Sequence, residues 1–361
     1  MRSGQAKTTA FAVALVALSA SLTRAQQDVS DPDTGPAARC IAALGAPNAG
    51  TPVSRAALRD YLGALSRARS DCAAAAKSDA PDPHVLFHLG VIRQRQGRHA
   101  DAARMFERAA QDGIAAALTK LGDYRNFGTG GVAQNVERAV ALYRQAAQAG
   151  DAPGMTTLAI MYRLGRGVPQ DHARALELLE RAARQGYHFA QITLARLAIA
   201  PKDIPDDQAA ALGLPDPRMA VDNYGKAALQ GNMQAALELA SLYADDGRGV
   251  DANPNLHTLW TRRAAEAGHP ESLKTLALMH EMGRGVAYDP ARAAQLFVQA
   301  LETGEVDAAS LREAPGLPRR RWDRQTAIEF QTILIERGLY RGPLDGIVGP
   351  GTLAGARRLG G

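Results

Sequence analysis

The stretch LAIMYRLGRGVPQD, residues 158–171, is followed by the alanine pair Ala182-Ala183 and by Gly186, and this order of residue types recurs along the chain. In five units the alanine pair is followed three positions later by a glycine, and in the sixth Ala300-Leu301 takes the place of the pair. The glycines stand 37, 36, 45, 37 and 36 residues apart, at Gly113, Gly150, Gly186, Gly231, Gly268 and Gly304. So regular a period over six units is typical of a stacked repeat.

Each unit also carries the signals that begin and end helices. Asp or Asn follows the glycine turn and predicts the N-cap of a helix, because its side-chain oxygen accepts from the free N–H groups of the first turn. These residues are Asn135, Asp171, Asp216, Asn253 and Asp289. The closing glycines suit the C′ position, where the backbone adopts a positive φ. Each unit is therefore predicted to be a helix, a glycine turn and a capped second helix, which makes the fold an all-α, right-handed helical solenoid.

These columns resemble the Sel1-like repeat (SLR) family, a relative of the tetratricopeptide repeat. The resemblance spans residues 84–304, and its first unit, with Gly90, Gly97 and Phe106, is more similar to a tetratricopeptide repeat with a short turn. It implies a non-catalytic adaptor that holds partners together, often in a bacterial envelope or in secretion. On this basis we expect the concave helical surface to bind an envelope protein partner.

One unit is longer than its neighbours. The interval from Gly186 to Gly231 has about nine extra residues around positions 201–207, where the glycine turn is missing. Insertions in a repeat become loops on one face, often the binding face. The extra residues either make a functional contact or form a loop that the fold tolerates, and the sequence is consistent with both interpretations.

Residues 1–25 have the pattern of a secretory signal peptide, with Arg2 and Lys7 before an apolar stretch and a cut near Ala25. An uncleaved anchor is the alternative. Removing this segment, which includes Arg24, lowers the formal charge from +5 to +2, so nucleic acid is not an expected partner. We expect a periplasmic protein without stable membrane insertion after cleavage, because no later segment is apolar enough to span a bilayer.

The two cysteines lie in the N-terminal helical segment, residues 26–83. In an oxidising compartment a lone pair such as Cys40 and Cys72 is more often a disulfide than a metal site or a nucleophile. Two buried free thiols are the alternative.

The repeat stops at Gly304, and residues 305–318 read as a linker before a small helical module, residues 319–361. From Leu317 onward there are eight arginines, no lysines and four acidic residues. The turns around Gly338, Asp345-Gly346 and Gly349 resemble a truncated peptidoglycan-binding domain. The resemblance implies binding to wall glycan or its carboxylates, and the candidate ligand residues are Tyr340, Arg341, Asp345, Thr352 and Arg357. Asp345 is expected to cap a turn and Thr352 to N-cap the last helix. The alternative to peptidoglycan binding is a degenerate module that only covers the end of the solenoid.

Catalytic patterns are missing from the sequence. The eight histidines are scattered, and no phosphate loop, G-x-S-x-G or HExxH motif is present, so we expect no enzyme, no metal and no cofactor. The sequence predicts a non-catalytic periplasmic adaptor that binds a protein through its repeats and is tethered to peptidoglycan. The alternative is an auxiliary protein that positions peptidoglycan for a separate remodelling enzyme.

Overall fold

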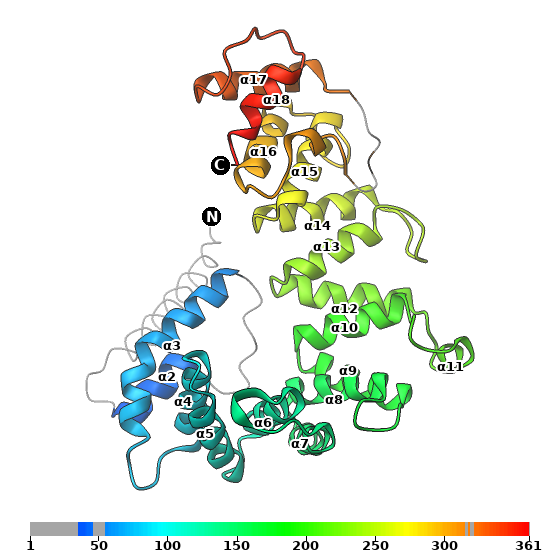
Figure 1. Cartoon of the computed structure of the whole chain (residues 1–361). Coiled ribbons are helices and arrows are strands. Elements are labelled where there is room, and N and C mark those ends of the chain that lie inside the picture. Colours follow the sequence, from blue (N-terminus) through cyan, green and yellow to red (C-terminus); the bar gives the residue numbers. More distant parts are fainter. Residues whose placement is uncertain (1–34, 46–54, 315–316, 318–320, 361) are drawn as a thin grey trace, which may run out of the picture. The chain divides into compact units, whose positions relative to one another are not determined.

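The computed structural model describes residues 35–45, 55–314, 317 and 321–360, and every regular element in this part of the chain is a helix (Figure 1). The predicted all-α helical repeat fold is therefore confirmed. The chain divides into two compact units, one of residues 1–49 and 59–149 and one of residues 50–58 and 150–361. The predicted signal peptide, residues 1–25, lies outside the described residues.

The first unit holds the N-terminal helices and the first repeats. Its α-helices are α2 (Pro36–Leu44), α3 (Arg55–Ala75, from residue 59 on), α4 (Pro83–Arg95), α5 (His99–Gln111), α6 (Ala115–Phe127) and α7 (Val136–Gln148), with the 3-10 turn η2 (Thr129–Gly131). A disulfide joins Cys40 of α2 to Cys72 of α3, which confirms the predicted pairing. Both cysteines are fully buried against α4 and its neighbours.

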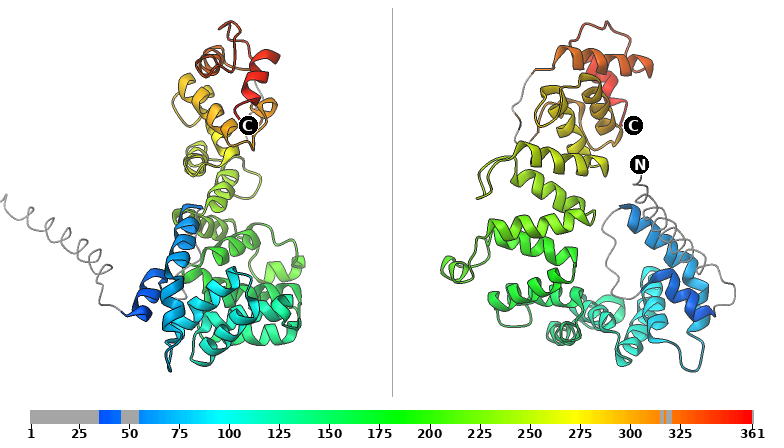
Figure 2. Two further views of the ribbon diagram at one scale, coloured as in Figure 1. Left: turned by 60° about the vertical axis from the view of Figure 1, so that its left-hand side comes forward. Right: turned by 180° about the vertical axis from the view of Figure 1, so that it is seen from behind.

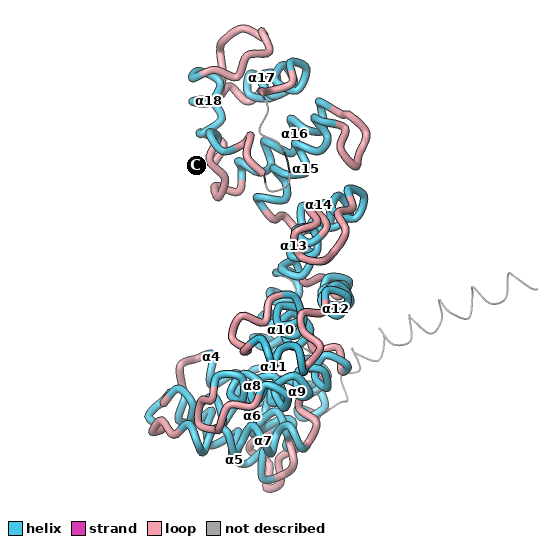
Figure 3. The backbone as a smooth tube through the Cα atoms, turned by 90° about the vertical axis from the view of Figure 1, so that its right-hand side faces the viewer, coloured by secondary structure: helices cyan, strands magenta, loops and turns pink. Residues whose placement is uncertain are grey.

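The second unit holds the remaining repeats and the C-terminal module. Its helices are α8 (Ala152–Leu164), α9 (His172–Arg184), α10 (His188–Ile199), α11 (Asp206–Ala211), α12 (Pro217–Leu229), α13 (Met233–Leu242), α14 (Pro254–Glu266), α15 (Pro270–Met282), α16 (Pro290–Glu302), η3 (Ala308–Ser310), α17 (Arg324–Glu336) and α18 (Pro350–Arg357). The two helices of each repeat pack against each other, α8 on α9, α10 on α12, α13 on α14 and α15 on α16, and Figure 3 shows the trace of these helices.

All five predicted N-caps are confirmed. The side chain of Asn135 accepts from the backbone N–H of Arg138 at 2.7 Å, and Asp171 accepts from that of Arg174 at 2.9 Å. Asp216, Asn253 and Asp289 cap α12, α14 and α16 in the same way. The glycines that close the units all adopt positive φ, between 72° and 92°.

The extra residues of the long repeat form an ordered excursion. They include the short helix α11, and Ile204 is buried with only 5% of its surface exposed. Arg163 of α8 pairs with Asp203 at 3.0 Å and so joins the excursion to the preceding repeat. The insertion is therefore packed on the stack rather than attached only at its ends.

Small residues on the first helix of a repeat make room for large residues on the second. In the first unit, a Cβ added to Gly122 of α6 would lie 2.5 Å from Cε1 of Tyr143 of α7, and one added to Gly90 would lie 2.6 Å from Phe106. Tyr143 is fully buried, and its hydroxyl donates to Asp123 at 2.9 Å. The two helices can approach closely only because Gly122 has no side chain.

Replacing Gly122 by alanine is expected to destabilise the first unit by about 1–3 kcal/mol, because the new methyl group overpacks against the Tyr143 ring. Urea unfolding of the purified protein measures this change. Gly225→Ala in α12 is the matched control, since nothing lies within 4 Å of a Cβ built there. That variant should gain about 0.5–1 kcal/mol from helix propensity. Equal stabilisation by both changes would contradict the close packing.

None of the helices in the described residues has both the length and the apolar composition needed to cross a bilayer.

Candidate functional site

The C-terminal module packs directly on the last repeat and shares its core. Phe330 and Leu334 of α17 and Ala356 of α18 are fully buried in one cluster with Phe297 of α16. The Trp322 ring, just before α17, stacks on Phe330 with centroids 5.2 Å apart and contacts Phe297 at 5.0 Å. The module therefore covers the apolar face of the last repeat, as a cap of the stack must. The described residues 305–314 take part in this packing, since Val306, Ala308 and Leu311 are buried.

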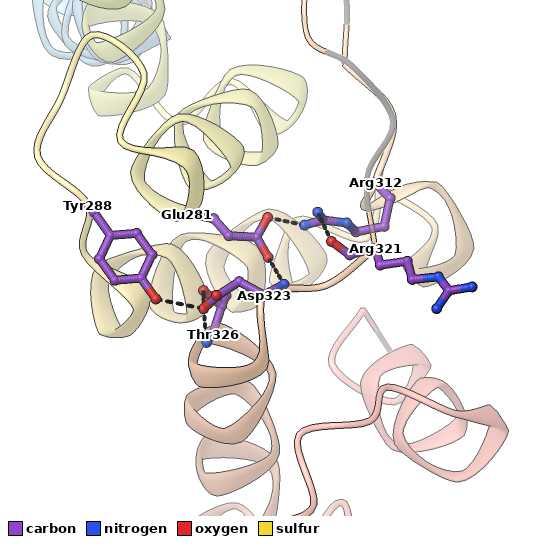
Figure 4. A network of polar contacts seen from close by, with 6 residues as sticks. All are labelled: Glu281, Tyr288, Arg312, Arg321, Asp323 and Thr326. Atoms are coloured by element: carbon purple, nitrogen blue, oxygen red, sulfur yellow. Dashed lines mark hydrogen bonds and ion pairs between the residues drawn. The ribbon is translucent and has the colours of Figure 1, made fainter.

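A buried carboxylate anchors this junction (Figure 4). Glu281 of α15 forms an ion pair with Arg312, and its second oxygen accepts from the backbone N–H of Asp323 at 2.8 Å. Only 2% of the Glu281 side chain and 10% of the Arg312 side chain are exposed. Arg312 also donates to the carbonyl of Arg321 at 3.0 Å, and its guanidinium lies over the Trp322 ring at 5.1 Å. Burial raises the pKa of Glu281, and the adjacent Arg312 offsets part of that rise.

Asp323 joins the same network and starts α17. Its carboxylate accepts from the backbone N–H of Thr326 at 2.9 Å and from the Tyr288 hydroxyl at 2.9 Å. Partial burial acts to raise its pKa, but these hydrogen bonds outweigh it and hold the pKa of Asp323 below its ordinary value of 3.8. One side chain thus caps α17 and connects it to the loop before α16.

Asp323→Ala is expected to destabilise the second unit by about 1–2 kcal/mol at neutral pH, because a helix cap and a side-chain hydrogen bond are lost. Because the pKa of Asp323 is lower in the folded state than in the unfolded state, its ionised carboxylate adds stability. This contribution is complete above the pKa of the unfolded state and is lost as the pH falls through the pKa of the folded state. The difference between wild type and variant should therefore stay constant down to about pH 4 and shrink below it. Urea unfolding across this range measures it, and a difference that grows in acid would contradict the assignment.

Gln331 organises the loop that carries most of the predicted ligand residues. Its buried side chain donates to Asp345 at 2.9 Å and to the carbonyl of Ile347 at 3.1 Å, and it accepts from the N–H of Gly346 at 3.1 Å. Asp345 also accepts from the N–H of Ile347 at 2.8 Å, which confirms that it caps a turn. These hydrogen bonds, with that from Gln331 the largest cause, lower the pKa of Asp345. The Asp345 carboxylate therefore stabilises the loop through these two hydrogen bonds.

The other predicted ligand residues divide into buried and exposed groups. The half-buried Tyr340 packs close to Gly351 and Gly355 of α18, and its hydroxyl donates to the carbonyl of Pro343 at 3.2 Å. Thr352 is 1% exposed and is not the N-cap of α18, because the helix begins one turn earlier at Pro350 with Gly349 as its cap. The preference for Pro at the first helical position moves the start. Arg341 and Arg357 are exposed.

The residues that anchor the module carry no local sequence motif. Glu281 and Arg312 are 31 positions apart, and Glu281 and Asp323 are 42 apart, so no local pattern brings them together. The sequence offers one indication: Glu281 is a charged residue among the mainly apolar residues that form the buried face of α15. Across the described residues, no three His, Cys, Asp or Glu side chains gather in a way that could hold a metal ion.

Comparison with known proteins identifies the repeats. Residues 115–151, 152–187, 209–232, 234–269 and 270–304 match the family model of the Sel1 repeat. No curated protein matches the chain. A crystal structure of a Sel1 repeat protein from Oxalobacter formigenes is similar at 25% identity, over 69% of this chain and 67% of that one, with a TM-score of 0.50.

Two further solved structures show lower similarity. One is c5321, a protective antigen of uropathogenic Escherichia coli strains that displays an SLR fold, with 21% identity over 85% of this chain and 84% of that one and a TM-score of 0.37. The other is the immunity protein Pa5087 from Pseudomonas aeruginosa, with 17% identity over 72% and 86% and a TM-score of 0.36.

These five segments are therefore Sel1 repeats, which confirms the resemblance given by the glycine, alanine and cap columns. The family match begins at residue 115 and ends at residue 304, so the pair α4 and α5 and the C-terminal module lie outside it. Sel1 repeats serve as scaffolds for protein–protein interaction and are generally non-catalytic.

Proposed function

We propose that this chain is a non-catalytic periplasmic adaptor that binds a protein partner through its Sel1 repeats and is tethered to peptidoglycan through its C-terminal module. The observation that carries the proposal is the run of Sel1 repeats over residues 115–304, because such repeats are protein-interaction scaffolds. The periplasmic location rests on the signal-like residues 1–25 and is supported by the disulfide, which is typical of oxidising compartments.

A largely apolar stripe on α8 supports partner binding at this part of the repeats. Pro153, Thr157, Ile160 and Leu164 are spaced by four, three and four residues and so share one helix face. Thr157 is the one polar member of this stripe. None of the four is buried, and Leu164 is 53% exposed. Phe189, on the neighbouring α10, is 48% exposed. Apolar side chains left together on a surface often mark an interface.

The partner proposal is tested with Leu164→Glu and Phe189→Glu, because a charge in an apolar interface weakens the complex. Native gels of periplasmic extract should show the wild type in a larger complex and both variants as the free chain. Leu229→Glu is the control, since Leu229 is 66% exposed on α12, outside the stripe. Migration of all three variants with the complex would contradict binding through the stripe.

The tether is supported by charge. The segment from Leu317 onward has eight arginines against four acidic residues, and Arg341 and Arg357 are exposed, so it is suited to carboxylate-bearing wall polymers. Co-sedimentation with purified peptidoglycan tests it: the wild type should pellet, and the double variant Arg341→Gln/Arg357→Gln should stay largely in solution. Point variants are preferable to truncation, because removing α17 would expose the core around Phe297. Equal pelleting of both proteins, or of neither, would contradict the tether.

A further inference from the structure

The loop between α17 and α18, residues 337–349, exposes two aliphatic side chains at fixed positions. Leu344 is 50% exposed and Ile347 is 67% exposed. The backbone beside them is held from within by buried Gln331, which bonds the carbonyl of Ile347 and the N–H of Gly346. The conformation that exposes Ile347 is therefore stabilised by these hydrogen bonds.

Two arginines accompany these aliphatic residues. Arg341 is an exposed residue of the loop itself. Arg324, the first residue of α17, runs against the loop, because a Cβ built on Gly346 would lie 2.6 Å from its Cγ. Within the residues that the structure describes, neither guanidinium forms an ion pair. The loop has one acidic residue, Asp345, and its carboxylate is occupied by Gln331 and by the N–H of Ile347.

The position of the loop helps to decide between a peptide and a bilayer surface as its partner. Figures 1, 2 and 3 show the loop on the outer side of α17, away from α15 and α16, at one end of the second unit. Extended peptides commonly bind along a sheet edge, and the part of the chain that the structure describes contains no strand. A bilayer surface suits an exposed loop of this composition, because aliphatic side chains enter the interfacial region while arginines remain at the level of the phosphates.

We propose that this loop docks on a bilayer surface that carries anionic lipid headgroups. Leu344 and Ile347 enter the boundary between headgroups and acyl chains, and Arg324 and Arg341 contact the lipid phosphates. The contact is peripheral and reversible, since two side chains do not anchor a protein permanently. This membrane contact goes beyond the proposed function and uses aliphatic side chains that the peptidoglycan tether does not need.

Flotation with lipid vesicles tests the proposal on the full mature chain. The wild type should float with vesicles of phosphatidylglycerol and phosphatidylethanolamine, and not with phosphatidylcholine vesicles. Arg324→Gln/Arg341→Gln should weaken binding roughly 30-fold, at about 1 kcal/mol for each arginine near an anionic surface. Leu344→Ser/Ile347→Ser should weaken it roughly tenfold or more, and this loss should persist at high salt.

The control is Leu229→Ser/Leu259→Ser, which removes two exposed leucines, 66% and 40% exposed, from α12 and α14. It should bind vesicles as the wild type does. Circular dichroism should be unchanged in all variants, because every substituted side chain is on the surface.

Three results would overturn the membrane proposal. One is no flotation of the wild type. Another is a loss caused by the arginine variant while the serine variant of the loop binds normally, especially if soluble polyglutamate competes; this would indicate an acidic protein partner. The third is an equal loss in the Leu229 and Leu259 control. Peptidoglycan pelleting is measured separately, so a failed wall tether with intact flotation, or the reverse, identifies which proposal is wrong.

Discussion

Glu281→Ala is expected to lower the free energy of unfolding of the second unit by about 3–5 kcal/mol. The substitution leaves the Arg312 guanidinium, 10% exposed, without its carboxylate, and it removes the acceptor of the Asp323 N–H. Removing one member of a buried ion pair costs more than the pair contributes, because the remaining guanidinium still loses water on folding but no longer has the carboxylate that offset this cost. Urea unfolding measures the loss, and amide hydrogen exchange should locate it in α15, α16 and α17.

Glu302→Ala is the matched control for this prediction. Glu302 pairs with Arg337, but 40% and 43% of these two side chains are exposed, so their ion pair is screened by water. Its removal should cost about 0–1 kcal/mol. The double variant Glu281→Leu/Arg312→Leu should recover much of the lost stability, because no charge is then left buried. A single variant Glu281→Ala no worse than Glu302→Ala would show that the pair does not anchor the module.

The double variant Cys40→Ser/Cys72→Ser is expected to destabilise the first unit by about 3.7 kcal/mol, the chain-entropy value for closing a loop of this length. The bond spans 32 positions and ties α2 to α3. Without it, α2 would be held by apolar contacts, by the ion pair between Arg39 and Asp71 of α3 at 2.9 Å, and by the contact between His88 Nε2 and the Gly45 carbonyl at 2.9 Å. Urea unfolding of the first unit, followed by hydrogen exchange in α2 to α5, measures the loss.

Reduction of the wild type provides the control for the disulfide. Dithiothreitol should bring the wild type to the stability of the serine variant and should leave that variant unchanged. The second unit should unfold as before in every case, because both cysteines belong to the first unit. A serine variant that matches the oxidised wild type would contradict a stabilising role for the bond.

The repeat fold could be predicted from the sequence because its determinants are local and recur. Cap residues such as Asp171 and Asp289 act within three residues of themselves, and glycines such as Gly186 act on their own backbone. Each signal is weak alone, but six units in register leave one fold that satisfies them all. The disulfide was predictable for a different reason, since two cysteines allow only one pairing.

The candidate site was less predictable, because its geometry depends on distant partners. Asp345 was correctly expected to cap a turn, a contact two residues away. Thr352 was wrongly expected to cap α18, since Pro350 starts the helix and carries Thr352 into its buried first turn. The burial of Glu281 depends on Arg312 and on the N–H of Asp323, which only the folded chain brings beside it.

Photo-crosslinking in living cells tests whether the Sel1 repeats bind a protein partner. A photoreactive amino acid is placed at Leu164 or Phe189 on the exposed first-helix faces, and at Leu229 or Leu259 as exposed controls. We expect an adduct of one defined mass at Leu164 and Phe189 that is missing at Leu229 and Leu259. No adduct at any position, or the same adducts at all four, would contradict a scaffold that binds its partner through this surface.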